Sequence, residues 1–155
     1  MNTIFDAIRS QNLEAVDSFL KKDPSLVHTK DQRGSTPLLL STYYGFLDIA
    51  KLIISRGADI NQQDASGNTA LMGVCFKGHY EIAELLISNG ADVDIKSYND
   101  ATALIFAATF GQKEIIRLLI SKGADVTIKD NTGRTAEMHA QSHGIDFAEL
   151  LNETE

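Results

Sequence analysis

Cysteine and positive charge are scarce in this sequence of 155 residues. Cys75 is the single cysteine, so the chain can form neither an intrachain disulfide nor a four-thiolate zinc site. Lys and Arg number 14 against 21 Asp and Glu, which gives a net charge of −7 at pH 7. Binding to phosphate backbones requires clustered cations. The charge balance therefore excludes nucleic acid as a leading partner, and the single cysteine fits a reducing compartment.

Long apolar runs are also missing, since no stretch approaches the roughly 18 residues that a membrane-spanning helix requires. Residues 1–9 lack the basic region and apolar core of a secretory signal. We therefore expect a cytoplasmic protein without a membrane segment. With 43% hydrophobic residues, the chain is long enough to form one globular domain with its own core, and we expect it to be a monomer.

What the sequence does contain is internal repetition with a period of 33 residues. The word Gly-Ala-Asp begins at positions 57, 90 and 123, and threonine recurs at positions 3, 36, 69, 102 and 135. At this period no residue is left over, so we predict a single repeat domain over residues 1–155. Its five units cover approximately 1–30, 31–63, 64–96, 97–129 and 130–155.

Each unit has the pattern of a tight turn followed by two helices. Residues 31–34 read Asp-Gln-Arg-Gly, where glycine allows the positive φ of the turn. Asp100 replaces this glycine in the fourth unit, and Asp is among the few residues that tolerate that conformation. We expect Thr36 to cap the first helix and Pro37 to be its first residue. The second helix carries apolar residues at helical spacing and should end at the glycine of Gly-Ala-Asp, as in Ile49, Leu52, Ile53 and Gly57.

These motifs resemble the ankyrin repeat, whose signature runs Asp-x-x-Gly-x-Thr-Pro-Leu-His-x-Ala-Ala, then Gly-x-x-x-Ile-Val-x-x-Leu-Leu, then Gly-Ala-Asp-x-Asn. Residues 31–63 match it best, and the resemblance covers the whole chain. It implies an all-α solenoid of five helix-turn-helix units with hairpin-like β-turns between them. It also implies a protein–protein interaction module that is not an enzyme and holds no cofactor. Apolar residues replace the signature's histidine, so we expect apolar stacking at Leu39, Met72, Ile105 and Met138.

The end units carry polar residues at positions that are apolar in the middle units. Asp6, Asp17 and Lys21 do so in the first unit, and Glu137 replaces a leucine in the last. Because a solenoid needs polar outer faces on its terminal units, we interpret both as caps and the array as complete. The last unit is irregular, with its apolar residues one position early, and we expect its second helix to stop after Leu151.

The resemblance also implies a binding surface, namely the concave side formed by the hairpin tips and the solvent side of the first helices. Twenty positions of units two to five fall there, and none is Asp or Glu, whereas composition alone predicts about three. Five of the eleven aromatic residues lie there too, and aromatic residues dominate binding hot spots. We predict that a neutral or mildly acidic partner protein contacts Arg33, Tyr43, Tyr44, Phe76, Lys77, Tyr98, Phe110 and Arg134.

Other interpretations stay open at this point. The rings of Phe76 and Phe110 could instead only pack between neighbouring first helices, and aspartates beside the hairpins could restore negative charge. The protein could be a regulatory inhibitor or an immunity-type subunit that blocks an enzyme. It could also depend on a metal, because His139 and His143 lie four residues apart on a predicted helix. No third ligand is implied, which favours solvent-facing histidines and no metal site. We expect Cys75 to be a buried structural thiol.

Overall fold

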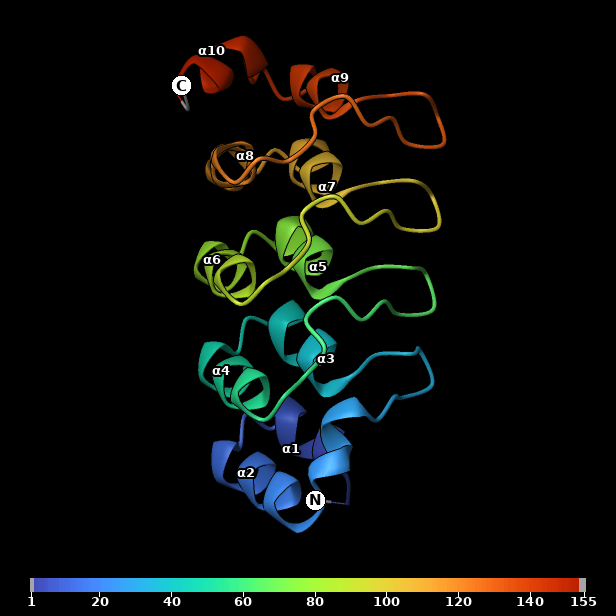
Figure 1. Ribbon diagram of the computed structural model, residues 1–155, viewed down its shortest axis with the longest axis vertical. Helices are drawn as coiled ribbons and strands as arrows, with labels where there is room; N and C mark the ends of the chain where they lie inside the picture. Colours follow the sequence, from blue (N-terminus) through green and yellow to red (C-terminus); the bar gives the residue numbers. More distant parts are fainter. Residues whose placement is uncertain (1, 154–155) are drawn as a thin grey trace.

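The computed structural model describes residues 2–153, and over this range the chain forms ten α-helices, one short 3-10 helix and no strand. The ten helices form five consecutive pairs, and Figure 1 shows the pairs stacked in sequence order along the long axis. The all-α solenoid of five helix-turn-helix units is thereby confirmed. Met1, Thr154 and Glu155, which the predicted terminal units include, lie outside the described residues.

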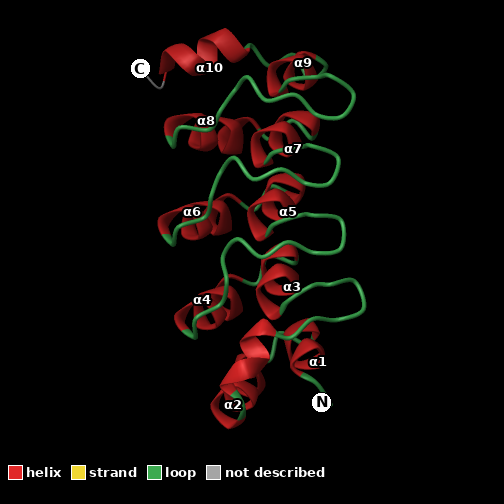
Figure 2. Cartoon of the chain, turned by 45° about the vertical axis from the view of Figure 1, so that its right-hand side comes forward, coloured by secondary structure: helices red, strands yellow, loops and turns green. Residues whose placement is uncertain are grey.

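The helices form two parallel rows. The first helices of the units are α1 (Ile4–Arg9), α3 (Pro37–Tyr43), α5 (Ala70–Lys77), α7 (Ala103–Thr109) and α9 (Ala136–Gln141). The second helices are α2 (Leu13–Lys22), α4 (Leu47–Ser55), α6 (Tyr80–Ser88), α8 (Lys113–Ser121) and α10 (Phe147–Glu153). The loops between units project from the first row, on the side away from the second row (Figure 2).

The first helices begin as their sequences predict. The Thr36 hydroxyl accepts a hydrogen bond from the Leu39 amide at 3.2 Å, and Pro37 is the first helical residue, where its missing N–H leaves no bond unmade. In α1 the cap is reciprocal, since the carboxylate of Asp6 also accepts the backbone N–H of Thr3 at 3.1 Å. The repeated threonines therefore set the start of every first-row helix.

The hairpins are held by short-range polar contacts. One carboxylate oxygen of Asp31 accepts the amides of Arg33 at 2.8 Å and Ser35 at 2.9 Å, which fixes the turn. Asp100 has φ of 61°, so the predicted left-handed conformation at this position is confirmed.

The second helices end slightly earlier than predicted. The C-cap of α4 is Arg56, and Gly57 follows it with φ of 89°.

The hairpin tips are linked to one another along the stack. The backbone N–H of Ala65 donates to the carbonyl of Arg33 at 3.2 Å, and that of Tyr98 donates to Ser66 at 3.1 Å. Asn131 donates in the same way to Asn99 at 3.0 Å. The four projecting loops thus form a continuous edge.

A continuous core lies between the two helix rows. The predicted apolar stacking is confirmed for Leu39, Met72 and Ile105, which are all buried. It is wrong for Met138, whose side chain is 49% exposed. The helix α9 is the last first-row helix of the described chain, so no following first helix covers Met138. Glu137 is exposed for the same reason.

The first unit differs from its predicted form at Asp17. This residue forms ion pairs with Lys21 at 3.0 Å and with Arg56 of the second unit, so its carboxylate lies at the junction between the units. The prediction that Asp17 belongs to an outer face is therefore wrong. After α2 the chain forms the 3-10 helix η1 (Pro24–His28), whose Val27 is buried.

The last unit is irregular, as predicted. Its second helix, α10, buries Phe147 and Leu150 and is drawn side-on in Figure 1, where α8 is seen nearly end-on. The helix continues to Glu153 rather than stopping after Leu151. Arg117 of α8 donates to Glu153 from Nε at 2.6 Å, which ties the added turn to the fourth unit.

Candidate functional site

A groove of about 960 Å³ runs along the first helices of units one to four. Hairpin residues such as Arg33 and Ser66 border one side, and residues near the C-terminal ends of the first helices border the other. Its floor is made by residues from the middle of these helices, including Leu40, Met72 and Phe106. The groove therefore lies where the first-row helices meet the hairpin loops.

Aromatic rings form a connected row on the helix side of this groove. Tyr43 stacks on Phe76 with 6.2 Å between ring centroids, and Phe76 meets Phe110 edge to face at 4.5 Å. Tyr44 lies edge-on to Tyr43 at 5.6 Å and stacks on Phe46 at 5.7 Å. The row thus spans units two to four, with each ring held by a neighbour.

These rings are in contact and yet remain open to solvent. The exposed fractions of Tyr43, Tyr44, Phe76 and Phe110 lie between 39% and 47%. Large apolar side chains left this exposed and grouped together are typical of interaction sites. The rings therefore pack against one another, but this packing leaves them exposed. Packing alone does not explain why aromatic residues lie here.

Two cations accompany the aromatic row. The ammonium of Lys77 lies 5.3 Å from the centroid of the Tyr43 ring, within the range of a cation–π interaction. Arg33 lines the groove from the hairpin side. Neither side chain forms an ion pair with another residue that the structure describes.

The aspartates beside the hairpins line the groove as well. Asp31 and Asp64 each use one carboxylate oxygen to accept two backbone amides of their own turn. Their negative charge is therefore offset in part by the N–H dipoles of the turn, and their side chains are fixed in place.

The structure brings together most of the predicted partner-binding residues, but not all of them. Arg33, the tyrosine pair, Phe76 and Phe110 line the groove, and Lys77 joins them through Tyr43. Tyr98 lies elsewhere, 70% exposed and packed over Gly67, and it borders a separate polar hollow of about 410 Å³. Arg134 lines neither hollow. At the fourth and fifth units, the predicted hairpin residues therefore lie outside the groove that the ends of the first helices border.

Sequence reasoning missed several groove residues, namely Phe5, Arg9, Leu40, Gly73 and Phe106. Three of them, Leu40, Gly73 and Phe106, occupy the same position of successive repeats, three residues before Tyr43, Phe76 and Thr109. A helix turn brings residues three apart to the same face. This three-residue spacing was the sequence signal from which their place beside the aromatic residues could have been predicted.

The family comparison agrees with this architecture. A model of the family described as "Ankyrin repeats (3 copies)" matches residues 4–97 and again residues 96–155. The chain belongs to the ankyrin-repeat family.

Individual relatives match only part of the chain. It is 41% identical over 49 residues to the serine/threonine-protein kinase VIK of Arabidopsis thaliana, over 32% of this chain and 11% of the kinase. It is 34% identical over 60 residues to the ankyrin repeat and SAM domain-containing protein 6 of Rattus norvegicus, over 39% and 7% respectively. Human protein phosphatase 1 regulatory subunit 27 is 39% identical over 56 residues, or 36% of each chain. The chain thus spans well under half the length of each of these relatives.

Ankyrin repeats generally mediate protein–protein interaction, and the family is typically a non-catalytic binding module. Within residues 2–153, no helix is both long and apolar enough to cross a membrane. No group of three or more His, Cys, Asp or Glu side chains in the described chain is arranged to hold a metal ion.

In this ankyrin stack a ladder of side-chain hydrogen bonds supports the aromatic row. Nε2 of His79 donates to the carbonyl of Tyr43 at 3.1 Å, and the Gln112 amide donates to the carbonyl of Phe76 at 3.3 Å. His143 continues the ladder by donating to Thr109 at 2.6 Å. Each bond reaches from one repeat to the helix end of the repeat before it. The backbone that carries the rings is therefore fixed from the neighbouring unit.

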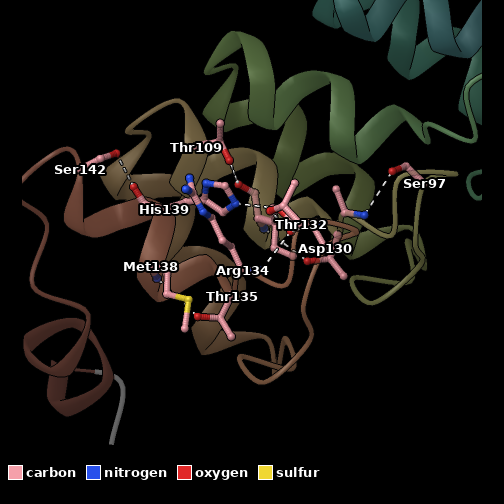
Figure 3. A network of polar contacts seen from close by, with 12 residues as sticks. Ser97, Thr109, Asp130, Thr132, Arg134, Thr135, Met138, His139 and Ser142 are labelled. Atoms are coloured by element: carbon pink, nitrogen blue, oxygen red, sulfur yellow. Dashed lines mark hydrogen bonds and ion pairs between the residues drawn. The ribbon is translucent and has the colours of Figure 1, made fainter.

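The two C-terminal histidines have separate partners. Nε2 of His139 donates to the carboxylate of Asp130 at 2.7 Å, and the His139 side chain is only 16% exposed (Figure 3). The prediction of solvent-facing histidines is therefore wrong for His139, because the imidazole closes the last hairpin. It holds for His143, which is exposed although its ring is bound to Thr109.

The electrostatics around Asp130 follow from these contacts. Burial alone would raise the pKa of this carboxyl, but hydrogen bonds from Thr132, His139 and the Arg134 amide outweigh it and hold the pKa well below its usual range. Figure 3 shows these groups converging on the carboxylate from the hairpin and from α9. The carboxylate of Asp130 therefore stabilises the last hairpin and its contact with α9.

Cys75 is buried, as predicted. Desolvation raises the pKa of its thiol far above the ordinary value, so the nucleophilic thiolate is suppressed.

Proposed function

We propose that this ankyrin-repeat chain binds another protein through the groove bordered by Tyr43, Tyr44, Phe76 and Phe110. The observation that carries the proposal is the connected row of rings, each supported by a neighbour and each more than one third exposed. Rings that are already ordered lose little side-chain entropy when a partner covers them. The proposed role is that of a monomeric, non-catalytic adaptor; the cytoplasmic location stays a prediction.

The geometry favours this face over the opposite one. The aromatic row and the hairpin edge together make a surface that is concave and mostly apolar, with cations close by. The second-row helices instead present isolated exposed apolar residues, such as Leu13 and Tyr80. A single exposed side chain needs no functional explanation, whereas a contiguous group does.

The test compares capture of proteins from an extract of the native cells. The bait is the wild-type chain, and the variant combines Tyr43→Ala, Tyr44→Ala and Phe110→Ala. We expect a protein that the wild type retains and the triple variant loses. A matched variant, Leu13→Ala with Tyr80→Ala, removes exposed apolar groups from the second row and should retain that protein.

Circular dichroism and thermal unfolding of all three chains establish that the variants are folded. Equal retention of every captured protein by the wild type and a folded triple variant would contradict the proposal. Loss caused only by the Leu13 and Tyr80 substitutions would move the site to the second row of helices.

A regulatory role is the second candidate. It is favoured by the similarity to a protein named as a phosphatase regulatory subunit, and it corresponds to the inhibitor or immunity-type function that the sequence left open. The two roles differ in what the captured partner does. A partner enzyme whose activity changes when the wild-type chain is added, but not when the triple variant is added, would assign the regulatory role.

A further inference from the structure

The floor of the groove contains a gap in a row of large side chains. Leu40 of α3, Gly73 of α5 and Phe106 of α7 are equivalent residues of three successive repeats, and all three line the groove. The first and third fill their positions with large apolar groups, while Gly73 contributes no side chain. A Cβ placed at Gly73 would find just one neighbouring atom within 4 Å, a ring carbon of Tyr43 at 3.5 Å. The gap is therefore open space rather than a packed position.

The backbone does not require glycine at this position. Ten of the chain's eleven glycines have positive φ, and Gly73 is the exception within residues 2–153, because it lies inside α5. Glycine in a helix interior is less favourable than alanine. A Cβ contact at 3.5 Å is also ordinary van der Waals packing, so alanine would fit. What glycine provides here is space in the groove, which we call the Gly73 notch.

The surroundings of the Gly73 notch define what can fill it. The ring of Tyr43 lies closest to it, and Phe76, Phe110, Met72 and Phe106 line the same groove. An apolar side chain that entered the notch would bury its own surface and cover these rings. A polar side chain would lose its hydration without gaining a partner.

The charges beside the notch define what should flank that apolar group. Arg33 lines the groove, Lys77 lies over the ring of the groove residue Tyr43, and neither has an ion-pair partner in the described chain. The net charge of −7 acts over the whole molecule, but exposed charges are screened beyond about 8–10 Å at physiological salt. Asp31 and Asp64 line the same groove, but each of these carboxylates accepts two amides of its own turn. The charges without such contacts are those of Arg33 and Lys77, which favours carboxylates on the partner.

The length of the groove sets the size of the occupant. It extends over the first helices of four units, and packed helices lie about 8–10 Å apart, so the three intervals give a run of about 24–30 Å. An extended chain advances about 3.3 Å per residue. About seven to nine residues of extended chain would therefore span the groove.

From these observations we infer that the groove receives an extended acidic segment of another protein, with one large apolar side chain in the Gly73 notch and Asp or Glu residues facing Arg33 and Lys77. This inference rests on the proposed function, because it names the chemistry of the partner. It identifies Gly73 as the residue that determines which side chain is accepted at the centre of the groove.

The probe is a displayed library of random 12-residue peptides selected on the wild-type chain. We expect the enriched peptides to be negatively charged and to share one large apolar residue flanked by acids. The most enriched peptide, labelled with fluorescein, is then titrated against variants. Gly73→Leu, which fills the notch, should weaken its binding about tenfold or more. Gly73→Ala, which adds a single methyl group, should weaken it less and serves as the variant most certain to fold.

Charge is tested with matched double substitutions. Arg33→Glu with Lys77→Glu should weaken binding of the same peptide about tenfold or more, since attraction becomes repulsion. Lys51→Glu with Lys122→Glu makes the same change in net charge at exposed positions of the second row, and it should alter binding less than about twofold. Raising the salt concentration should weaken the wild-type complex.

Three outcomes would overturn the inference. These are enrichment of basic peptides, enrichment of peptides without a shared apolar residue, and binding that a folded Gly73→Leu variant leaves unchanged. Failure to enrich any peptide would be a fourth such outcome, because it would show that the groove takes no extended segment. If a cellular protein is nevertheless lost with the Tyr43, Tyr44 and Phe110 triple variant, the proposed function stands and only the partner's chemistry is wrong.

Discussion

The ring of Phe76 meets the ring of Phe110 edge to face, with 4.5 Å between their centroids, although the two residues belong to different repeats. Both remain about two fifths exposed. The sequence left two interpretations of these rings, packing between helices or contact with a partner. The contact geometry makes the two compatible, because each ring contacts a neighbouring ring and still remains partly exposed to solvent. Such rings are ordered before a partner arrives.

A double-mutant cycle measures the coupling between these two rings. Phe76→Ala and Phe110→Ala should each lower the free energy of unfolding, and the double variant should lose less than the sum of the two. The expected coupling energy is about 0.5–1.5 kcal/mol, which is typical of aromatic pairs. Urea unfolding of the four proteins gives this value.

The control cycle combines Phe76→Ala with Tyr98→Ala, because Tyr98 lies outside the aromatic row. Its effects should add within about 0.5 kcal/mol. Equal additivity in both cycles would show that the Phe76–Phe110 contact does not order the rings.

The two glycines Gly67 and Gly73 should respond in opposite directions to the same substitution. Gly73→Ala should raise the free energy of unfolding by about 0.5–1 kcal/mol, since alanine is the better helix former and its methyl group fits beside Tyr43. Gly67→Ala should lower it by more than about 1 kcal/mol. Gly67 has φ of 79°, and a Cβ there would lie 2.7 Å from the backbone nitrogen of Tyr98. Urea unfolding of both variants tests the pair, and a stabilised Gly67→Ala would contradict the hairpin geometry.

The fold could be predicted from the sequence because a 33-residue period repeats the same local signals five times. Thr36 and Pro37 mark the start of a helix by chemistry that acts within one turn, and Asp100 marks a left-handed turn in the same way. The errors lie where a distant contact decides the outcome. The position of Asp17 depends on Arg56 in the next unit, and α10 ends at Glu153, where that residue meets Arg117.

The groove could be predicted only in part, for a similar reason. Aromatic residues at the ends of first helices are visible in the sequence, so Tyr43 and Phe76 were found. Gly73 carries no side chain, and its role depends on the two neighbouring repeats that supply Leu40 and Phe106. Tyr98 was included because it belongs to a hairpin tip, but its ring packs over Gly67 and lies outside the groove.

The docking of α10 should depend on the ion pair between Glu153 and Arg117. Glu153→Gln should increase hydrogen exchange of the α10 amides and leave the exchange of α1 to α6 unchanged, because each repeat contacts only its neighbours. The hydrogen bond from Arg117 lowers the pKa of Glu153 in the folded chain. The contribution of this pair is therefore present above the unfolded pKa of about 4.3 and is lost as the pH falls through the lower, folded value.

Glu149→Gln is the matched control, since it removes the same charge from the same helix without removing this hydrogen bond. We expect a smaller change in α10 protection than for Glu153→Gln. Equal changes would mean that the charge of α10, rather than its contact with Arg117, governs docking.

The contact between His139 and Asp130 should make the last repeat sensitive to acid. Asp130→Asn keeps an oxygen for the turn amides but removes the charge that faces His139, and it should lower stability by about 1–2 kcal/mol at pH 7. The folded pKa of Asp130 is depressed, so the wild-type advantage is present above the unfolded value of about 3.9 and shrinks as the pH falls below it. Urea unfolding of both proteins at pH 7 and at pH values down to about 3 measures this difference.

The double variant Asp130→Asn with His139→Ala distinguishes the contribution of the histidine from that of the turn amides. The loss of stability caused by Asp130→Asn should be smaller when no imidazole faces residue 130. If that loss is the same with and without His139, the turn amides alone hold the carboxylate and the histidine contributes nothing to the last repeat.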